Sequence, residues 1–416
     1  MTELDNVAVV TRDSQAGTKF EDLGVTLIDD IPQAHKFALI NIKRNEPVVR
    51  YGVILGYALD DIKQGAWINE HMLRLPEPVS VDNMPWGVNV KTRDLPEAKI
   101  KTFMGYRNPD KTGFAGTRNI LGINTTVQCV QGVLDVAVNR IKAELLPKYK
   151  NVDDVVAVNH AYGCGVAINA PEAVIPIRAL QNIARHPNFG GQLMVVSLGC
   201  EKLTVDRLLE NQPELNNPDN VIVLQDCKGF EAMMKAIMDM AERKLKILNN
   251  RKREELPLSD LLVGMQCGGS DAFSGVSANP SAGYAADMLV QAGATVMFSE
   301  VTEVRDGVHL IAERCVSEKV RDKLAAEMRW YDNYLLAGEV DRSANPTPGN
   351  KKGGLANIVE KAMGSIAKSG TSPIVDVLSP AERVVKGEYP NGMIYAATPA
   401  SDIVCGPCQL AVTENL

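Results

Sequence analysis

Residues 261–293 read LLVGMQCGGSDAFSGVSANPSAGYAADMLVQAG, and this stretch decides the fold class. It begins with an apolar run at 261–265, which is long enough for one buried strand. Small, polar and ionisable residues follow at 266–271, Asn279-Pro280 keeps the connection irregular, and apolar residues then repeat at helical spacing. A strand, a glycine-rich polar loop and a helix form the unit whose loop holds ligands in open α/β sheets. The alternative interpretation is an ordinary turn that happens to contain a cysteine.

The same unit recurs along the chain, without a repeat of fixed period. Strand patterns are found at 121–127, 155–158, 193–198, 221–224, 294–298, 374–378 and 393–397. Helical patterns are found at 133–146, 171–184, 230–249 and 318–334. This alternation predicts parallel strands joined by helical crossovers. The segment Asn345–Gly354 is expected to be a loop without regular structure, because it is rich in Pro, Gly and Asn.

The first hundred residues show a different pattern of apolar and turn-forming residues. Residues 1–75 contain short apolar or alternating runs separated by turn-forming residues, which predicts a small β domain. Residues 76–103 are rich in Pro and polar residues and predict a linker, with Trp86 docked on a neighbouring surface. We therefore expect a multi-domain α/β protein with a second α/β domain at 104–252 and a C-terminal α/β domain at 258–409.

Composition excludes several classes of protein. The 416 residues carry a net charge of -7 and no long basic run, which argues against a general nucleic-acid binder. No apolar run reaches the roughly 18–20 residues that span a bilayer, and the N-terminus lacks the pattern of a signal peptide. Eight cysteines in such a chain are expected to be thiols rather than disulfides. We therefore expect a cytoplasmic protein.

Three cysteines occupy equivalent places in the predicted units. Cys164, Cys200 and Cys267 each follow a strand directly and lie beside glycine. Because the carboxyl ends of parallel strands gather at one edge, these thiols are expected to converge on one crevice. Thiolate sulfur suits iron, zinc or an iron–sulfur cluster. The alternative is that they are ordinary small residues in tight loops, and the single pair Cys405–Cys408 is a weak signal alone.

Other ionisable residues, at strand ends or near turns, could also take part in a site. His35 and His160 are candidates for a metal ligand or a general acid or base. Carboxylates at strand ends can bind a metal through oxygen, and they are Glu201, Asp271, Glu300 and Glu303. Cations near glycine-containing turns can recognise a carboxylate or phosphate, and they are Arg118, Lys202, Lys351, Lys352 and Lys368. Each of these residues has a surface or capping role as its alternative. Neither a Walker loop nor a GxGxxG turn between a strand and a helix is present, which disfavours ATP and nicotinamide cofactors.

At these loops the chain closely resembles the galactarate/altronate dehydratase family. The matching stretches are His35–Leu39, Asn159–Gly165, Leu198–Glu201, Cys267–Asp271, Ser299–Glu303, Asn345–Gly354 and Thr398–Asp402. Gly163–Asn169 and Ser299–Asp306 resemble the galactarate branch more than the altronate branch. The family continues well beyond the Ser-Asp-X-Val-Cys-Gly motif, whereas this sequence stops eleven residues after Cys405. We therefore expect a shortened C-terminal domain and interpret residues 410–416 as a possible tag remnant.

The resemblance implies an N-terminal domain of the SAF type and a two-part α/β body with a Rossmann-like parallel sheet. It implies dehydration of an aldarate, most directly galactarate to 5-dehydro-4-deoxy-D-glucarate, by removal of a proton α to a carboxylate. A divalent metal is expected to assist, with Fe²⁺ first, Mn²⁺ or Mg²⁺ as alternatives and an iron–sulfur cluster less favoured. The expected partner is a dicarboxylate sugar acid and a second copy of the chain in a dimer, with no nucleic acid and no membrane.

Roles for individual residues follow from the resemblance. The predicted catalytic residues are His35, Lys36 and His160. The predicted substrate-binding residues are Arg118, Lys202, Ser270, Asn350 and Lys351. The predicted metal ligands are Cys164, Cys200, Glu201, Cys267 and Asp271. The alternatives are an altronate dehydratase, a lyase like the sulfolactate sulfo-lyases, and a sugar-acid-binding protein without turnover.

Overall fold

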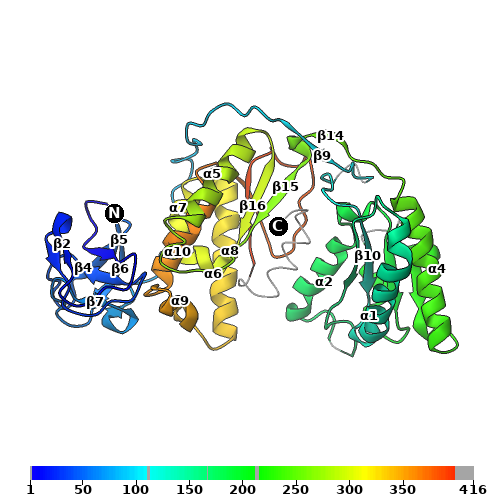
Figure 1. Ribbon diagram of the computed structural model, residues 1–416, viewed down its shortest axis with the longest axis horizontal. Helices are drawn as coiled ribbons and strands as arrows, with labels where there is room; N and C mark the ends of the chain where they lie inside the picture. The colour runs from blue at the N-terminus through cyan, green and yellow to red at the C-terminus, as the bar shows by residue number, and fades with distance from the viewer. Residues whose placement is uncertain (1, 110–112, 166, 211–214, 399–416) are drawn as a thin grey trace.

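The computed structural model describes residues 2–109, 113–165, 167–210 and 215–398. Within this part of the chain three domains lie in a row, with the C-terminal domain between the N-terminal β domain and the second domain (Figure 1). The expected multi-domain α/β fold is confirmed. Several predicted features lie outside the described residues. They are positions 399–402 of the Thr398–Asp402 motif, Cys405, Cys408 and the tag-like residues 410–416.

The N-terminal domain is built from short antiparallel strands. One sheet has the order β1-β4-β7, and a second has the order β5-β6-β8, with β2 and β3 as a separate pair. Their bounds are β1 (Val7–Val9), β2 (Lys19–Phe20), β3 (Val25–Thr26), β4 (Lys36–Ala38), β5 (Pro47–Arg50), β6 (Val53–Ala58), β7 (Trp67–Ile68) and β8 (Leu73–Arg74). Strand β4 is central in its sheet and fully buried, and His35, directly before it, is also buried, so neither His35 nor Lys36 faces solvent.

The second domain holds a parallel sheet of order β11-β10-β12-β13. Its strands are β10 (Ile120–Thr125), β11 (Asp154–Val158), β12 (Met194–Ser197) and β13 (Val221–Val223). Helices α1 (Gln131–Arg140) and α4 (Phe230–Leu248) cover one face, and α2 (Pro171–Ile183) and α3 (Val205–Leu208) cover the other. Alternation along β12 accounts for both layers, because Met194 and Val196 pack toward α4 while Val195 packs toward α2.

The C-terminal domain has a parallel sheet of order β15-β16-β18-β17. Its strands are β15 (Leu262–Met265), β16 (Thr295–Ser299), β17 (Ile374–Leu378) and β18 (Met393–Ala396). Its helices are α5 (Ala278–Gln291), α6 (Val301–Val304), α7 (Val308–Ala312), α8 (Glu318–Ala337), α9 (Pro348–Lys352) and α10 (Ile358–Ile366). No helix in the described part of the chain is long and apolar enough to cross a membrane.

The C-terminal sheet is covered by its own helices on one face and by the second domain on the other. Val296, Phe298 and Tyr395 pack against α6, α7 and α8. Met297 and Ile394 point to the opposite face, where they share a hydrophobic cluster with residues of α2. The strands are therefore buried on both sides, as parallel strands usually are.

The segment that follows β8 lies on the C-terminal domain. It has no helix or strand before β9 (Thr102–Gly105), which pairs with β14 (Glu254–Pro257). Val81 and Met84 are buried in the C-terminal core, whereas Trp86 is 43% exposed. The prediction that Trp86 docks this segment is therefore wrong, because Val81 and Met84 are the residues that pack into the C-terminal core.

Two local predictions are also wrong. Asn345–Gly354 contains the short helix α9, which begins with Pro348 at a position that tolerates proline. Thr347 and Asn350 form a reciprocal cap at its start, so polar residues that looked irregular in fact stabilise a helix. Pro280 likewise lies in the first turn of α5 rather than in an irregular connection.

Candidate active site at the edge of the C-terminal sheet

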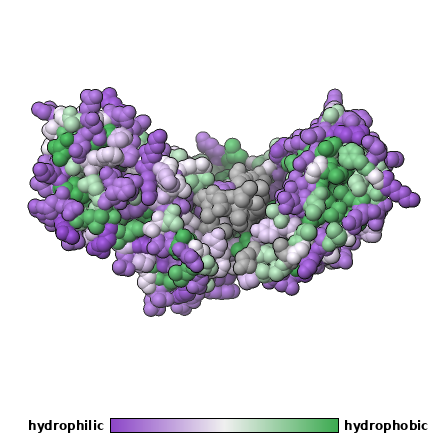
Figure 2. All heavy atoms as spheres, turned by 90° about the horizontal axis from the view of Figure 1, so that it is seen from below, coloured by the Kyte–Doolittle hydropathy of each residue, from purple (hydrophilic) through white to green (hydrophobic). Residues whose placement is uncertain are grey.

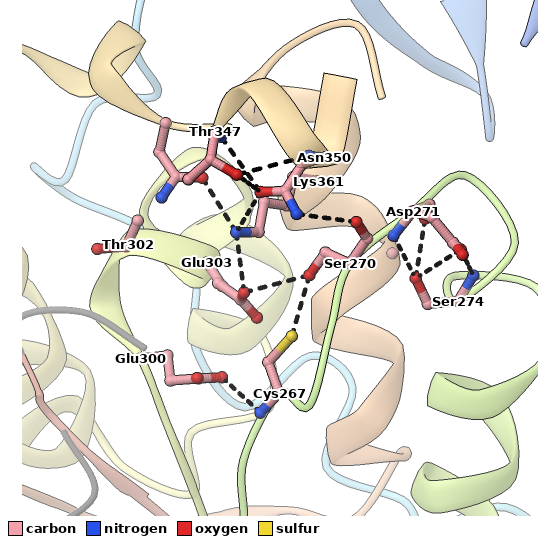
Figure 3. A network of polar contacts seen from close by, with 12 residues as sticks. Cys267, Ser270, Asp271, Ser274, Glu300, Thr302, Glu303, Thr347, Asn350 and Lys361 are labelled. Atoms are coloured by element: carbon pink, nitrogen blue, oxygen red, sulfur yellow. Dashed lines mark hydrogen bonds and ion pairs between the residues drawn. The ribbon is translucent and has the colours of Figure 1, made fainter. Parts of the chain in front are cut away.

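The loop after β15 brings a thiol and a hydroxyl together (Figure 3). The Cys267 Sγ lies 3.0 Å from the Ser270 Oγ, and both residues are half-buried. Asn350 of α9 donates its Nδ2–H to the Ser270 carbonyl oxygen at 2.9 Å. Gly268 and Gly269 are exposed, and a Cβ at either would meet no other atom within 4 Å. A ligand can therefore approach the backbone of this loop.

Beneath the loop lies a buried network of two carboxylates and two ammonium groups. Glu300 and Glu303 flank the start of α6, directly after β16, and both are fully buried. Lys368 donates to Glu303 Oε2 at 2.9 Å and also to Glu300. The Lys361 Nζ lies 3.2 Å from Glu303 Oε1. The backbone N–H of Cys267 donates to Glu300 Oε2 at 3.1 Å, so the loop and the network form one unit.

The backbone at Glu300 is itself unusual. Its φ is 78°, in the left-handed region that residues other than glycine rarely adopt. Such strain persists only where the surrounding structure enforces it, and it is often found at functional sites. Here Thr398 accepts the Glu300 N–H at its Oγ1 at 3.0 Å, and Lys368 holds the side chain. The observation points to this turn as a functional element.

The pKa shifts at the site stabilise the charged forms of Glu303 and Lys368 but the uncharged form of the Cys267 thiol. Burial alone would raise the pKa of Glu303, but the ammonium groups of Lys368 and Lys361 hold this pKa at about 2. Burial would lower the pKa of Lys368, but Glu303 and Glu300 raise it above its ordinary value. Burial and the charge of Glu303 raise the pKa of the Cys267 thiol. At neutral pH Glu303 and Lys368 are therefore charged, and the Cys267 thiol is protonated.

The N-terminal domain reaches the same region through β4 and β7. Trp67 donates its Nε1–H to His35 Nδ1 at 3.2 Å, so His35 Nε2 carries the proton and donates to the Lys352 carbonyl oxygen at 3.1 Å. Lys36 is 1% exposed, and its Nζ lies 2.9 Å from Glu360 Oε2. The predicted catalytic pair therefore lies at the contact with α9 and α10, and Lys36 is turned into that contact rather than toward open solvent.

The second domain gathers a separate group of predicted residues after β11 and β12. His160 donates from Nε2 to the Thr125 carbonyl oxygen at 2.8 Å and accepts from the Tyr162 N–H at Nδ1, at 3.1 Å. Burial lowers the pKa of His160, so the ring is neutral. Glu201 accepts from the Ser197 hydroxyl at 2.5 Å and from the Gly199 N–H at 2.7 Å. Its carboxylate therefore fixes the loop, while Cys164 and Cys200 are exposed.

The predicted metal ligands are divided between two domains. Cys164, Cys200 and Glu201 follow the sheet of the second domain, whereas Cys267 and Asp271 follow β15 of the C-terminal sheet. Asp271 Oδ1 accepts from the backbone N–H groups of Phe273 and Ser274, at 2.8 Å each, and so stabilises a turn. Among residues 2–398, outside the undescribed gaps, no group of three or more His, Cys, Asp and Glu is arranged to hold a metal ion.

The predicted substrate-binding residues are divided in the same way. Ser270, Asn350 and Lys351 lie together at the C-terminal loop. Lys202 is an exposed residue of the second domain, and its backbone N–H donates to the Gly163 carbonyl oxygen at 2.8 Å. Arg118 precedes β10 and lies at the amino end of the strand, opposite to the edge that carries His160.

Sequence reasoning missed Lys361 and the pairing of Glu303 with Lys368. The signal for Lys361 was present, because Glu360 and Lys361 interrupt an otherwise apolar and small-residue run at Ile358–Ile366. Charged residues inside a buried helix are rare unless they are paired. The pairing itself joins residues more than sixty positions apart, which no local pattern reveals.

Comparisons with known proteins agree over most of the chain. Models of three protein families match: "Altronate/galactarate dehydratase SAF domain" at 1–76, "D-galactarate dehydratase/Altronate hydrolase, second domain" at 105–249, and "D-galactarate/Altronate dehydratase, C-terminal" at 258–416. The galactarate dehydratase (L-threo-forming) of Escherichia coli (strain K12) is 56% identical over 98% of this chain and 78% of its own length. The altronate dehydratase of Bacillus subtilis (strain 168) is 32% identical over 96% of this chain and 78% of its own length. The (2R)-sulfolactate sulfo-lyase subunit beta of Chromohalobacter salexigens is 30% identical over 69% of each chain.

Proposed function

The chain belongs to the galactarate/altronate dehydratase family, and we propose that it is a hydro-lyase that converts galactarate to 5-dehydro-4-deoxy-D-glucarate. The choice of galactarate is supported by 56% identity to a galactarate dehydratase, against 32% to an altronate dehydratase. Altronate dehydration and sulfolactate cleavage are the alternatives within the family.

The observation that carries the proposal is the buried pairing of Glu303 with Lys361 and Lys368 beneath the open Cys267–Ser270 loop. An aldarate carries a carboxylate at each end, and ammonium groups bind carboxylates. Its dehydration begins with loss of a proton next to a carboxylate, which requires a base and stabilisation of the negative charge that develops. The network holds both kinds of group.

In the proposed mechanism Glu303 takes the proton α to the substrate carboxylate. Its pKa of about 2 makes it a weak base in the free protein. A substrate carboxylate that binds Lys361 and Lys368 shares their charge, and the pKa of Glu303 then rises toward the range that suits a general base. The same two ammonium groups stabilise the enediolate that forms.

The leaving hydroxide takes a proton from the loop above the network. The Cys267 thiol is still protonated at neutral pH, and it lies beside the Ser270 hydroxyl. Transfer of this proton releases water and leaves a thiolate, which solvent reprotonates. As the enol becomes the keto acid, its carbon takes the proton held by Glu303 and its hydroxyl proton is lost to solvent. His35 and His160 are predicted alternatives for acid or base, although both ring nitrogens of each are already hydrogen-bonded.

The proposal also includes a divalent metal, with Fe²⁺ first and Mn²⁺ or Mg²⁺ as alternatives. The described residues do not fit such an ion as they stand, because Glu303 pairs with two lysines and Glu201 holds its own loop. No step above therefore depends on the metal. Metal analysis of protein purified without oxygen tests this part: one iron per chain would support it, iron with acid-labile sulfide would replace it by a cluster, and a metal-free active protein would contradict it.

We further propose that the protein is a cytoplasmic homodimer. All six cysteines in the described residues are free thiols, which supports a reducing compartment. In Figure 2 hydrophobic side chains gather on the second domain, where the exposed large hydrophobics include Val136, Phe230 and Ile247. Such surface supports association with a second copy. Light scattering that gives the mass of one chain would contradict the dimer.

The function is tested by incubating the purified protein with Fe²⁺ and substrate under anaerobic conditions. We expect a keto acid from galactarate, with less or none from altronate and glucarate. Release of sulfite from sulfolactate would support the sulfo-lyase alternative instead. Binding of galactarate in a calorimeter without any keto acid would identify a sugar-acid-binding protein.

The first prediction concerns Glu303 itself. Glu303→Gln keeps the size of the side chain but removes the proposed base, and we expect kcat to fall by about 10²–10⁴-fold. Glu318→Gln is the matched control, because that carboxylate is 66% exposed at the start of α8. Turnover by Glu303→Gln within a few-fold of the wild type would remove Glu303 from the mechanism.

A further inference from the structure

Helix α10 carries two adjacent buried charges that face different domains. Glu360 is 1% exposed and Lys361 is 6% exposed. Successive residues of a helix point about 100° apart, so the two side chains reach different partners. Glu360 meets the N-terminal domain, and Lys361 meets Glu303 of the candidate site. The first turn of α10 therefore links the domain contact to the proposed chemistry.

On the first side, two cations of the N-terminal domain surround Glu360. The Lys36 Nζ lies 2.9 Å from Glu360 Oε2, and Arg50 pairs with Glu360 Oε1. The backbone N–H of Ala356 also donates to Glu360, at 2.7 Å. Burial alone would raise the pKa of Glu360, but Lys36 and Arg50 hold it below its ordinary value, so the carboxylate is charged. Asn357, which caps α10, donates to the Leu55 carbonyl oxygen of the N-terminal domain at 2.8 Å.

The same two cations also hold the backbone on either side of the candidate site. Lys36 donates to the Gly354 carbonyl oxygen at 2.5 Å, two residues after α9. Arg50 donates to the Ala272 carbonyl oxygen at 3.1 Å, directly after the Cys267–Asp271 loop. At Gly354, where φ is 93°, a side chain would overlap the Ala34 carbonyl oxygen. The N-terminal domain thus presses closely on the loop, α9 and α10 together.

On the second side, Lys361 contacts side-chain oxygen atoms of the C-terminal domain. Its Nζ lies 3.2 Å from Glu303 Oε1, 3.0 Å from Asn345 Oδ1 and 3.4 Å from Asn350 Oδ1. Asn350 in turn donates to the Ser270 carbonyl oxygen at 2.9 Å. Figure 3 shows Lys361, Asn350, Ser270 and Glu303 converging at this point. A shift of α10 would move the Lys361 ammonium group away from all of these partners.

We propose that Glu360 is a positioning residue, through which Lys36 and Arg50 of the N-terminal domain hold Lys361 against Glu303. The N-terminal domain then acts in the reaction without touching the substrate, because its docking sets the place of an ammonium group in the site. This inference names a role within the proposed dehydratase and rests on that function. The structural part of the proposal, that Glu360 fixes the position of α10, does not depend on enzymatic activity.

The experiment compares Glu360→Gln with the wild type by amide hydrogen exchange and by kinetics. We expect faster exchange across residues 355–366 and 267–274, and a loss of at least tenfold that is mainly in kcat. Arg50→Met is the second variant. It leaves Lys36 and Glu360 as a buried ion pair with no net charge, so we expect this variant to fold. Asn119→Ala is the control for general destabilisation, since that buried amide bonds to Asn151 and Leu248 within the second domain.

A double-mutant cycle separates positioning from a merely structural effect. If Glu360 acts through Lys361, then Glu360→Gln costs less than about threefold in kcat when Lys361→Met is already present. Losses that multiply in the double variant would overturn the proposal, as would unchanged exchange of α10 in both Glu360→Gln and Arg50→Met. If the wild type dehydrates no sugar acid, the proposed function fails, and the exchange data alone decide whether Glu360 fixes α10.

Discussion

At the scale of single residues, we expect the cysteines to differ in reactivity because they differ in burial and in nearby charge. The thiolate is the reactive form, and burial and Glu303 raise the pKa of Cys267. Cys129, Cys164 and Cys200 are exposed. We predict that iodoacetamide at pH 8 modifies Cys267 at least several-fold more slowly than these three, as measured by peptide mass spectrometry. Cys315 is the internal control, because it is buried and burial raises its pKa to about 12.

Equal labelling rates for Cys267 and Cys200 would contradict this prediction. They would also weaken the proposed role of Cys267 as a proton donor, since that role requires a protonated thiol at neutral pH.

Glu201 provides a prediction about pH. Burial alone would raise its pKa, but the hydroxyls of Ser197 and Thr126 lower it to about 2, from an ordinary value of 4.5. A depressed folded-state pKa gives stability that is complete above pH 4.5 and is lost as the pH falls toward 2. Glu201→Gln should therefore cost about 1.5–3 kcal/mol of unfolding free energy at pH 7, the usual value for hydrogen bonds to a charged group.

The check is denaturant unfolding of both proteins at pH 7, 5 and 3.5. The difference between them should be the same at pH 7 and 5 and smaller at pH 3.5. A difference that stays constant down to pH 3.5 would mean that the Glu201 charge contributes nothing.

Residue types were easier to predict from the sequence than their roles. The ends of the strands before these cysteines and carboxylates were predicted correctly, because glycine and polar residues mark where a strand stops. Their grouping was not accessible, since it depends on which sheet each strand joins. Cys164 and Cys267 follow similar motifs, yet their strands belong to different sheets. The partners of Glu303 come from α10 and from the turn that follows it.

At the scale of elements, the site loop rests on α10 through a glycine–glycine contact. A Cβ at Gly275 would lie 2.7 Å from the Gly364 Cα and 3.0 Å from the Tyr51 Oη of the N-terminal domain. We predict that Gly275→Ala lowers the unfolding free energy by about 1–3 kcal/mol, because the backbone of α10 must move. Catalysis should fall as well, since Lys361 lies one turn away on the same helix.

The matched control is Gly132→Ala in α1, where a Cβ would meet nothing within 4 Å. That change should stabilise the protein by about 0.5–1 kcal/mol, because alanine favours a helix over glycine. Thermal unfolding and kcat of the two variants measure both effects. If Gly275→Ala behaved like Gly132→Ala, the close contact would not hold the loop.

Elements were predicted well where a pattern of hydrophobic residues was long. The strand at 374–378 and the helices at 171–184 and 230–249 match β17, α2 and α4 within one residue. Helix α10 was missed because its nine residues are too few for a clear helical repeat, and because its buried Glu360 and Lys361 look like surface positions in the sequence. Helix α9 was missed because capping residues and proline dominate its few positions.

At the scale of the molecule, the C-terminal domain is held from both sides by unlike contacts. The N-terminal domain docks through the buried charges around Glu360, and the second domain docks through the hydrophobic cluster shared by α2 and the C-terminal sheet. The chain between them lies along the C-terminal domain, where Arg321 donates to the Met84 carbonyl oxygen at 2.6 Å. The domains should therefore stay together even if this connecting segment is cut.

Limited digestion with trypsin tests that arrangement. Residues 91–101 have no helix or strand, and Lys91, Lys99 and Lys101 are exposed, so the first cuts should fall there. Arg93 should be cut more slowly, because it donates to the buried Asp287 at 2.7 Å.

We expect the nicked protein to elute as one species in gel filtration and to retain its kcat, since both domain contacts lie outside the cut segment. In Glu360→Gln the same cut should release the N-terminal fragment more readily, because Lys36 and Arg50 then lose their charged partner in a buried interface. Release of that fragment from the wild type at once would show that the connecting segment, and not the buried charges, holds the N-terminal domain in place.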